Sequence, residues 1–460
     1  MRDVIIVGAG LGGLSAAWRL RHWDTLILES RDRLGGRIRS QYKDGYVLNL
    51  GGHVFPGKGS SMGDLLAETG VDSTEIPGNL AAISMNGKLL TKGSVPSYAF
   101  RLPMKLRDRI NLMTTGARVS LDVIRYARAT ARRRGESAED VQKRTLAFEN
   151  ERNFADYLGE VNEDVEALFI PTVTRSSGAP HEISAGAGIG YFSLVWNVGA
   201  GLNRAILGGP STLIETIAAS QRERIQLGAE VTEVTQHDDH VTVTYVQDGV
   251  EHTEKARRVV MASTADVTRE VVTNFRPSLQ NALDQIKYGT WVSAAFPTKE
   301  TTPQAWDNCY GIATPKRSMA IVLNQANVVR GHETQRAPGG SIMVFSPAEL
   351  ADRLLPLSEE EIKDIYIDDL SEILPGFADI VDADNAIVAK WHTGGPYIFP
   401  GRAKLQDELL RPDRLIHLAG DFLGSKYGES AVESGFAAAQ QIASSLATER
   451  QTAKDKAAKS

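Results

Sequence analysis

The amino-acid sequence predicts an α/β fold in which a parallel-sheet domain is interleaved with a mixed α+β domain. Three observations lead to this prediction. The continuous apolar run at 4–7 is typical of a strand buried on both faces of a parallel sheet, and a helix over 14–21 and a strand over 25–29 complete a βαβ unit. Residues 225–262 show the alternation expected of further strands. A strand, a turn and a helix follow one another over 415–446.

The size and charge of the chain narrow the class of partner. At 460 residues the chain is too long for one small core, so we expect two domains that share a large interface. The formal net charge of -6 gives no overall attraction to phosphate backbones. This argues against nucleic-acid binding and favours a small-molecule substrate. The sequence gives no indication of the oligomeric state.

The cysteine content and the apolar runs bear on the compartment. Cys309 is the only cysteine, which excludes an intramolecular disulfide and a cysteine-based metal site, and we expect it to be a buried thiol and expect no metal. Glycines follow the first apolar run at once, unlike the h-region of a signal peptide, and no apolar stretch approaches the length of a membrane span. We therefore expect a cytoplasmic protein.

A glycine motif connects the first strand to the first helix. Gly8, Gly10 and Gly13 form GxGxxG, where missing side chains let a pyrophosphate approach the backbone and the helix N-terminus. Glu29 ends the second strand, where a carboxylate can accept hydrogen bonds from adenosine ribose hydroxyls. A tight turn without a ligand would not require this acid. Together these residues predict a Rossmann-like dinucleotide site.

The segment that follows the acidic strand end distinguishes between dinucleotides. Residues 31–38 read RDRLGGRI. Here the sequence resembles the flavin amine oxidase superfamily, which includes monoamine oxidases, protoporphyrinogen oxidase and phytoene-type desaturases. In that family the corresponding stretch reads much like RxGGR, and its arginine, matched by Arg37, lies near the FAD pyrophosphate. The resemblance implies FAD as the cofactor and adds Arg31 and Gly36 to the expected contacts.

The most specific part of the resemblance is C-terminal. Residues 416–435, IHLAGDFLGSKYGESAVESG, look like the family's final flavin-binding motif, in which a helix N-terminus points at the isoalloxazine. The positive end of a helix dipole stabilises negative charge on a reduced flavin. The resemblance therefore implies four cofactor residues at this end of the chain, which are Gly420, Asp421, Ala431 and Val432.

Three further segments match the family less specifically. The matching residues are Gly51, Gly52 and His53 in a loop near the flavin, Gly208 and Gly209 before a helix, and Val231 in a strand whose backbone meets the adenine in relatives.

The resemblance also implies the substrate side. Pro396 stands where a cysteine tethers the flavin in some relatives, so we expect FAD to be bound without a covalent link. Tyr397 and Tyr427 match two aromatic residues that flank the substrate in amine oxidases. Such a pair can clamp a flat or saturated ring and exclude water, while simple core packing is an equal alternative for each tyrosine. These two tyrosines and His392 are the candidates for proton transfer.

One departure from the family bears on the reaction. Amine oxidases of this family usually carry a lysine that holds a water against flavin N5, and its place here falls near Val292 or Ser293, with Lys287 or Lys299 as alternatives if the alignment slips. Its absence favours oxidation of a C–C bond. We therefore expect a desaturase that introduces a C=C bond into a small to medium, largely apolar cyclic substrate, such as a cyclic ketone. The alternative is oxidation of an amine to an imine; in either case oxygen or another acceptor would reoxidise the flavin.

The expected domains alternate along the chain. The FAD-binding domain is expected from 1–75, 205–275 and 395–447, the substrate domain from 76–204 and 276–394, and a frayed polar tail from 448–460.

A basic amphipathic helix is expected within the substrate domain. Apolar residues recur at steps of three and four from 102 to 124, and residues 101–134 carry ten lysines and arginines. Two interpretations stay open, a solvated helix face and peripheral docking on an anionic membrane surface.

Overall fold

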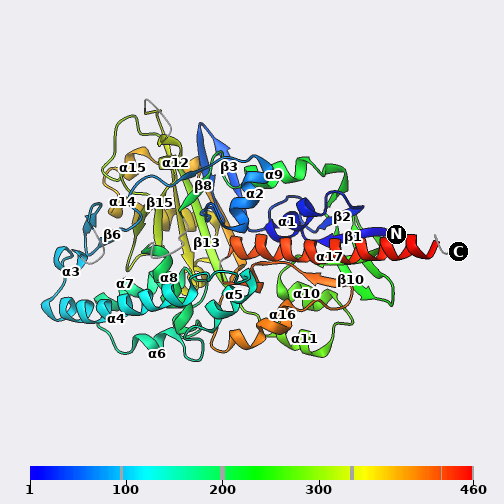
Figure 1. Cartoon of the computed structure of the whole chain (residues 1–460). Helices are drawn as coiled ribbons and strands as arrows, with labels where there is room; N and C mark the ends of the chain where they lie inside the picture. Colours follow the sequence, from blue (N-terminus) through cyan, green and yellow to red (C-terminus); the bar gives the residue numbers. More distant parts are fainter. Residues whose placement is uncertain (94–96, 197–202, 332–335, 426, 458–460) are drawn as a thin grey trace.

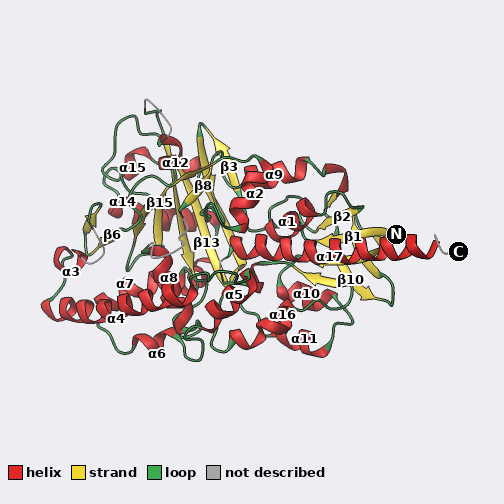
Figure 2. Ribbon diagram, viewed as in Figure 1, coloured by secondary structure: helices red, strands yellow, loops and turns green. Residues whose placement is uncertain are grey.

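Two separate seven-stranded sheets organise the molecule, and most helices pack around them (Figures 1 and 2). The structure is a computed structural model that describes residues 1–93, 97–196, 203–331, 336–425 and 427–457. Parallel and antiparallel strands mixed with helices confirm the predicted α/β fold class.

The first sheet is built around the N-terminal strand. Its members are β10 (Glu230–Gln236), β11 (Val241–Gln247), β12 (Val250–Met261), β1 (Arg2–Val7), β2 (Thr25–Glu29) and β9 (Ile225–Leu227) in spatial order, with β18 (Ile416–Leu418) beside β12. The strands β12, β1, β2, β9 and β18 pair in parallel, while β10 and β11 pair antiparallel. Alternate residues of β1 enter two cores: Val4 and Ile6 pack with α1 and α17, and Ile5 and Val7 pack with the strands β10 to β12. Both faces of β1 are therefore covered, which explains its continuous apolar run.

The second sheet is mainly antiparallel. Its order is β17 (Ile387–Pro396), β13 (Tyr288–Thr298), β16 (Gly340–Pro347), β15 (Ile321–Asn324), β14 (Gly311–Ala313), β6 (Ala82–Met85) and β7 (Lys88–Leu90). Cys309 lies in the core on one side of this sheet, and burial raises the pKa of its thiol to about 11. Cys309 is therefore an inert buried thiol, as predicted.

The helices and the two small sheets complete the fold. The helices are α1 (Leu11–Arg19), α2 (Ser61–Thr69), α3 (Tyr98–Arg101), α4 (Leu106–Thr130), α5 (Ala138–Ala147), α6 (Phe154–Leu158), α7 (Glu163–Thr174), α8 (Ala185–Val195), α9 (Ser211–Ala219), α10 (Ala265–Val271), α11 (Pro277–Asp284), α12 (Ala326–Arg330), α13 (Glu349–Leu354), α14 (Glu359–Ile373), α15 (Phe377–Ile380), α16 (Gln406–Leu410) and α17 (Gly428–Ala457). The small sheets pair β3 (Ser40–Lys43) with β4 (Tyr46–Asn49) and β5 (Ser73–Glu75) with β8 (Arg204–Ile206). No helix of the described chain combines the length and apolar character needed to cross a bilayer.

The amphipathic helix expected from residue 102 is present, but its bounds differ. Leu102 has an extended backbone, with ψ at 145°, because the following Pro103 disfavours the helical conformation. The helix α4 begins at Leu106 and continues beyond Ile124 to Thr130. Its buried residues pack with α6, α7 and α8 in one apolar cluster (Figure 1).

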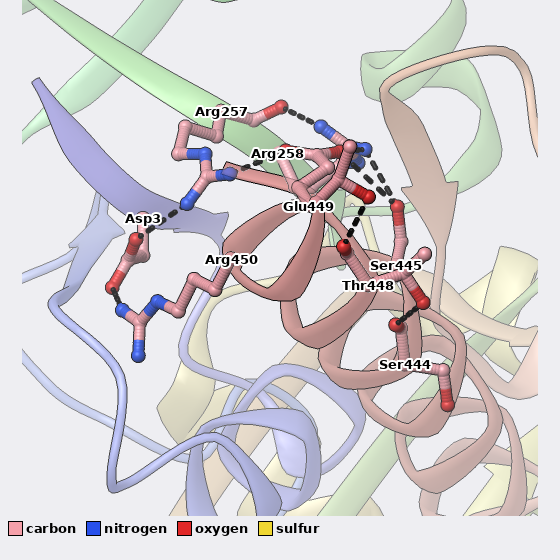
Figure 3. Close-up of polar contacts among 9 residues, drawn as sticks. Asp3, Arg257, Arg258, Ser444, Ser445, Thr448, Glu449 and Arg450 are labelled. Atoms are coloured by element: carbon pink, nitrogen blue, oxygen red, sulfur yellow. Dashed lines mark hydrogen bonds and ion pairs between the residues drawn. The ribbon is translucent and has the colours of Figure 1, made fainter. Parts of the chain in front are cut away.

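The expectation of a frayed tail after residue 447 is wrong, because α17 continues to Ala457. Figure 3 shows what holds this end: Arg257 and Arg258 of β12 converge on Glu449, and Arg450 donates to Asp3 at 2.9 Å. Burial alone would raise the pKa of Glu449, but the hydrogen bonds from the two arginines outweigh it and lower the pKa. The ion pairs fasten a polar helix end to the first sheet.

Candidate cofactor and substrate site

The three glycines of the first turn have three different surroundings. Gly8 has φ at +102°, a conformation that favours glycine, and it forms the turn. A Cβ on Gly13 would lie 2.0 Å from the carbonyl oxygen of Gly8, so this glycine lets the helix pack closely. A Cβ on Gly10 would meet no atom within 4 Å. Gly10 therefore borders open space, which is what a ligand approaching the backbone requires.

Glu29 is buried at the end of β2 and braces the turn. Its Oε2 accepts a hydrogen bond from the backbone N–H of Ala9 at 2.8 Å, and its Oε1 accepts one from the N–H of Arg31 at 3.1 Å. The expectation that a turn without a ligand would not require this acid is thus wrong. Each carboxylate oxygen has a second lone-pair site, so ribose hydroxyls can still donate to Glu29.

The segment after β2 folds back against the glycine turn. The N–H of Gly35 donates to the carbonyl of Ala9 at 2.9 Å, and a Cβ on Gly36 would lie 3.4 Å from the Cα of Gly10. The side chain of Arg31 is exposed, and only its backbone meets Glu29. The two glycines therefore form the second wall of the open space at Gly10.

Arg37 joins the two predicted motifs. Its Nη2 lies 2.8 Å from Oδ1 of Asp421, 384 residues further along the chain. Burial would lower the pKa of Arg37, but the carboxylate of Asp421 outweighs it and raises the pKa. The same guanidinium lies 3.5 Å from the carbonyl of Gly394 and over the ring of Tyr288. Arg37 is thus a fixed cation where the chain's first and last motifs meet.

The first helical turns of α1 and α17 lie side by side. A Cβ on Gly435 would lie 2.4 Å from the carbonyl oxygen of Gly12, and one on Gly12 would lie 3.3 Å from the amide nitrogen of Gly420. Ala431 and Val432 pack in the core shared by these helices. Their helix N-termini carry partial positive charge, and together they suit an anionic ligand.

The loop at 51–53 reaches the same region. A Cβ on Gly51 would lie 2.0 Å from the carbonyl oxygen of Arg37, and the N–H of Gly52 donates to that oxygen at 3.2 Å. Nδ1 of His53 hydrogen-bonds the carbonyl of Gly51 at 2.9 Å, and burial lowers the pKa of His53. This histidine is therefore neutral at neutral pH.

The remaining predicted residues lie at two edges of the site. Val231 packs in the core of the first sheet, two residues beyond Ala229, whose N–H donates to the carbonyl of Glu29 at 2.9 Å. Gly208 and Gly209 have φ at +77° and +94° and turn the chain into α9. Val231 therefore lies two residues from the strand contact with Glu29, and its contact with an adenine stays a prediction.

The two tyrosines are held differently. Tyr397 is 8% exposed within the helical cluster, and its hydroxyl donates to Glu182 at 3.0 Å. Burial, and then the charge of Glu182, raise the pKa of Tyr397. Tyr427 is half-buried at φ +50°, and its ring meets that of Tyr191 edge-on at 6.5 Å. Both rings lie near helix α8: Tyr427 contacts Tyr191, and Tyr397 packs in the same apolar cluster as Phe192.

The structure does not bring His392 to these tyrosines. Neighbouring residues of β17 face opposite sides. Trp391 is buried and donates to the carbonyl of Leu50 at 3.1 Å, beside the 51–53 loop, whereas His392 is exposed. Lys390, on the same side as His392, reaches carbonyls of the α13 region. His392 therefore lies on the solvent-facing side of β17.

Ser293 is, with Val292, one of the two positions at which the family's lysine is expected. It is 2% exposed, its Oγ donates to the carbonyl of Leu50 at 2.6 Å, and Nε1 of Trp391 donates to that Oγ at 3.1 Å. Lys287 and Lys299 each lie six residues from Ser293, about 20 Å along the strand. The position that corresponds to the family's lysine stays a prediction.

Two further residues were not predicted: Tyr288, which is partly buried with its ring facing Arg37, and Arg402, which is buried and interacts electrostatically with Tyr288. The hydroxyl of Tyr288 accepts the N–H of Ala265 at 2.9 Å. Arg402 is 3% exposed, donates to the carbonyl of Phe422 at 2.8 Å, and leaves its Nη1 without a partner in the described chain. Burial lowers the pKa of Arg402 to about 10. No motif in the sequence marks Arg402, since a Gly-Arg pair after a loop is ordinary.

These features fit the pyrophosphate of a dinucleotide. The open backbone at Gly10, two adjacent helix N-termini, and the cations Arg37 and Arg402 suit a pyrophosphate. The orphan Nη1 of Arg402 is a buried donor that a ligand oxygen would satisfy. Clusters of three or more His, Cys, Asp or Glu side chains that suit a metal ion are not found among the described residues.

Comparison with known proteins agrees with this geometry. A family model described as "Flavin containing amine oxidoreductase" matches residues 11–443. The chain is 26% identical to "Amine oxidase [flavin-containing] A" of Canis lupus familiaris, over 97% of this chain and 86% of that protein. It is 25% identical to "Polyamine oxidase 3" of Oryza sativa subsp. japonica, over 92% and 85% respectively.

Solved structures share the fold. The structure of "Cyclohexylamine Oxidase from Brevibacterium oxydans IH-35A" has a TM-score of 0.75 at 20% identity, covering 97% of this chain and 99% of that chain. Wild-type putrescine oxidase bound to putrescine has a TM-score of 0.74 at 22% identity, with the same coverage. At these identities the likeness establishes the architecture.

Proposed function

This chain belongs to the family of flavin-containing amine oxidoreductases, and we propose that it oxidises an amine to an imine with a non-covalently bound FAD. When bound, FAD would supply the two-electron oxidant: the carbon next to nitrogen would lose a hydride and the nitrogen a proton, so that the C–N single bond becomes C=N, and oxygen or another acceptor would reoxidise the flavin. That the chain is an FAD-dependent oxidoreductase follows from its membership of this family.

The observation that carries the proposal is the extent of the likeness to amine oxidases, which covers both sheets and the helical region between them. It favours the amine alternative over the cyclic ketone desaturase that the sequence motifs favoured.

The chain's own residues have distinct roles in this proposal. Gly10 and Arg37 admit and pair the pyrophosphate, and the ring of Tyr427 provides a wall of the substrate site. Tyr397 stays protonated, because its pKa is raised and its hydroxyl donates to Glu182. It therefore positions neighbouring groups and does not act as a base. Water exclusion and orientation are the protein's contribution, and the cofactor supplies the redox chemistry.

A second candidate function rests on Ser293. Because the sequence has Val292 or Ser293 where the family's lysine is expected, oxidation of a C–C bond is the alternative proposal. Cytoplasmic residence, the domain boundaries and the electron acceptor also remain predictions.

Anaerobic flavin bleaching discriminates the two reactions. Holoenzyme would be mixed without oxygen with cyclohexylamine, putrescine, a cyclic ketone and a porphyrinogen, and absorbance near 450 nm followed. We expect the amines to bleach the flavin. If the ketone or the porphyrinogen bleaches the flavin and neither amine does, the reaction is oxidation of a C–C bond and the amine proposal is wrong.

The absence of a tether is tested separately. Denatured protein should release all its flavin as free FAD, since Pro396 cannot form a thioether. Flavin retained on the denatured chain would contradict this part of the proposal.

A further inference from the structure

The outward face of α4 is apolar. Eleven large hydrophobic side chains of the described chain are exposed, and six of them lie between residues 100 and 124. Their exposed fractions are 63% for Phe100, 73% for Leu106, 56% for Ile110, 47% for Met113, 65% for Leu121 and 42% for Ile124. A helix that served only as a wall of the core would turn such a stripe inward.

Helix geometry places this stripe opposite the packed face. At about 100° per residue, the five exposed apolar residues of α4 fall within about 80° of one another. Thr115, Val119 and Val123 are buried and lie on the opposite side. Two of them, Val119 and Val123, pack in the cluster that includes α8. The stripe is therefore a second apolar face, separate from the one that joins α4 to the protein.

Cations border the stripe, and carboxylates do not. Of the ten lysines and arginines at 101–134, only Arg125 lies within ion-pair distance of a carboxylate among the described residues, at 2.6 Å from Asp122. Asp122 also accepts the hydroxyl of Tyr157 at 2.9 Å, which turns it toward the protein. Arg107 and Arg118 follow one border of the stripe and Arg109 the other.

We propose that α4 docks on an anionic lipid bilayer, lying in the plane of the interface with its apolar stripe among the acyl chains and its cations at the lipid phosphates. A second copy of this chain is disfavoured as the occupant, since two such faces would bring ten cations against ten. In Figure 1 the helix forms the lower left edge of the molecule, with both termini at the opposite side, so a flat surface can reach it.

The docked orientation has a consequence for the substrate side. The inner face of α4 carries Tyr126, and a Cβ on Gly190 of α8 would lie 2.7 Å from its ring. Tyr191, the next residue of α8, meets Tyr427. The helices α4 and α8 thus lie between the proposed bilayer surface and Tyr427, so docking would turn this side of the protein toward the membrane.

Vesicle sedimentation tests the proposal with full-length flavoprotein. The probes are phosphatidylcholine vesicles with and without about 30% phosphatidylglycerol. We expect binding to the anionic vesicles at low salt and release as salt rises. The triple variant Leu106→Ser, Ile110→Ser, Leu121→Ser should bind at least about tenfold more weakly. The matched control Val250→Ser, Val267→Ser removes exposed apolar side chains on other elements and should bind as wild type.

Flavin content and circular dichroism of both variants verify folding, since all five side chains are at least 40% exposed. Wild-type binding by the triple variant would overturn the proposal, as would equal binding to neutral and anionic vesicles. Concentration-dependent dimerisation without vesicle binding would assign the face to a second copy and also overturn it.

Discussion

The glycine cradle around Gly10 and the aromatic wall around Tyr427 are held by different means. Backbone contacts fix the cradle: the turn closes through positive φ at Gly8 and helix contact at Gly13, and Glu29 accepts two backbone N–H groups. The wall is held by ring contacts, such as the edge-on pair of Tyr427 with Tyr191. Backbone geometry tolerates little change, whereas side-chain packing relaxes around a substitution.

This difference predicts separate consequences. Changes in the cradle should alter folding or FAD affinity, while changes in the wall should alter turnover with FAD still bound. A variant that changes both FAD affinity and turnover would show that the cradle and the wall are coupled.

The largest effect is expected from Gly13→Ala. Its Cβ would lie 2.0 Å from the carbonyl of Gly8, so the free energy of unfolding should fall by about 3 kcal/mol or more. Gly10→Ala is the matched control, since its backbone, at φ -74°, suits alanine and its Cβ meets no protein atom. Apo-protein stability should change by less than about 1 kcal/mol in Gly10→Ala, while FAD affinity falls at least about tenfold. Chemical unfolding of the apo-proteins and FAD titration measure both. Unchanged FAD affinity in Gly10→Ala would place the cofactor elsewhere.

Glu29→Lys should weaken FAD binding by roughly a hundredfold, because a buried cation replaces the acceptor of two N–H groups. Glu29→Gln retains one acceptor oxygen and should lose less affinity. Titration of apo-protein with FAD compares the two. Equal losses would indicate that the charge, and not the bracing of the turn, determines binding.

Acid should destabilise the folded protein through His417 on β18 of the first sheet. Burial lowers the pKa of His417 to about 4, with the nearby charge of Arg258 also lowering it and the hydrogen bond to Gln441 opposing it. The unfolded pKa is about 6.5, so the unfolded state binds more protons between the two values, and stability is lost as pH falls from about 6.5 to about 4.

The contribution of His417 over this window is about 2 kcal/mol, allowing for partial relaxation. His417→Gln should therefore lose less stability than wild type between pH 7 and pH 4.5, as measured by denaturant unfolding. Parallel losses in the two proteins would assign the acid sensitivity to other groups.

The cradle was predictable because its determinants are local in sequence. GxGxxG, the strand before it and Glu29 fall within one βαβ unit, so their spacing alone predicted the turn and a dinucleotide site. The pairing of Arg37 with Asp421 could not be derived from spacing, since 384 residues separate them and only the folded sheet brings them together. Arg402 carries no pattern at all.

In the helical region, the sequence predicted the helix α4 but not its orientation against the protein. Periodicity predicted α4 and its apolar stripe, but it cannot tell which side meets the protein, because the buried face is formed by only a few small residues such as Val119. The continuation of α17 was missed for a related reason: its polar end is held by Arg257 and Arg258 from a distant strand, and composition records only that it is polar.

Tyr427→Ala tests the wall. Removing the ring should leave FAD affinity unchanged and slow flavin reduction by about tenfold or more, because the substrate loses orientation toward the flavin. Stopped-flow reduction with an amine that bleaches the wild-type flavin measures the rate, and the absorbance ratio of flavin to protein reports occupancy. Loss of FAD from this variant would show that wall and cradle are coupled, and a wild-type rate would remove Tyr427 from the site.

Tyr397→Phe should have the smallest effect, because its hydroxyl is engaged by Glu182 and not by a reacting atom. The phenol stays protonated, since burial and the neighbouring carboxylate raise its pKa. Loss of one hydrogen bond of this kind costs about 1 kcal/mol of stability, and Glu182 retains the N–H of Ala179 at 2.9 Å. We expect flavin reduction to slow by less than about threefold, with an unchanged pH profile. A structural tyrosine predicts both results, whereas a proton-transfer role predicts a large rate loss and the disappearance of one ionisation from the profile. If the rate falls strongly and one ionisation disappears, Tyr397 takes part in proton transfer. The substrate side would then contain a catalytic group and not only packed rings.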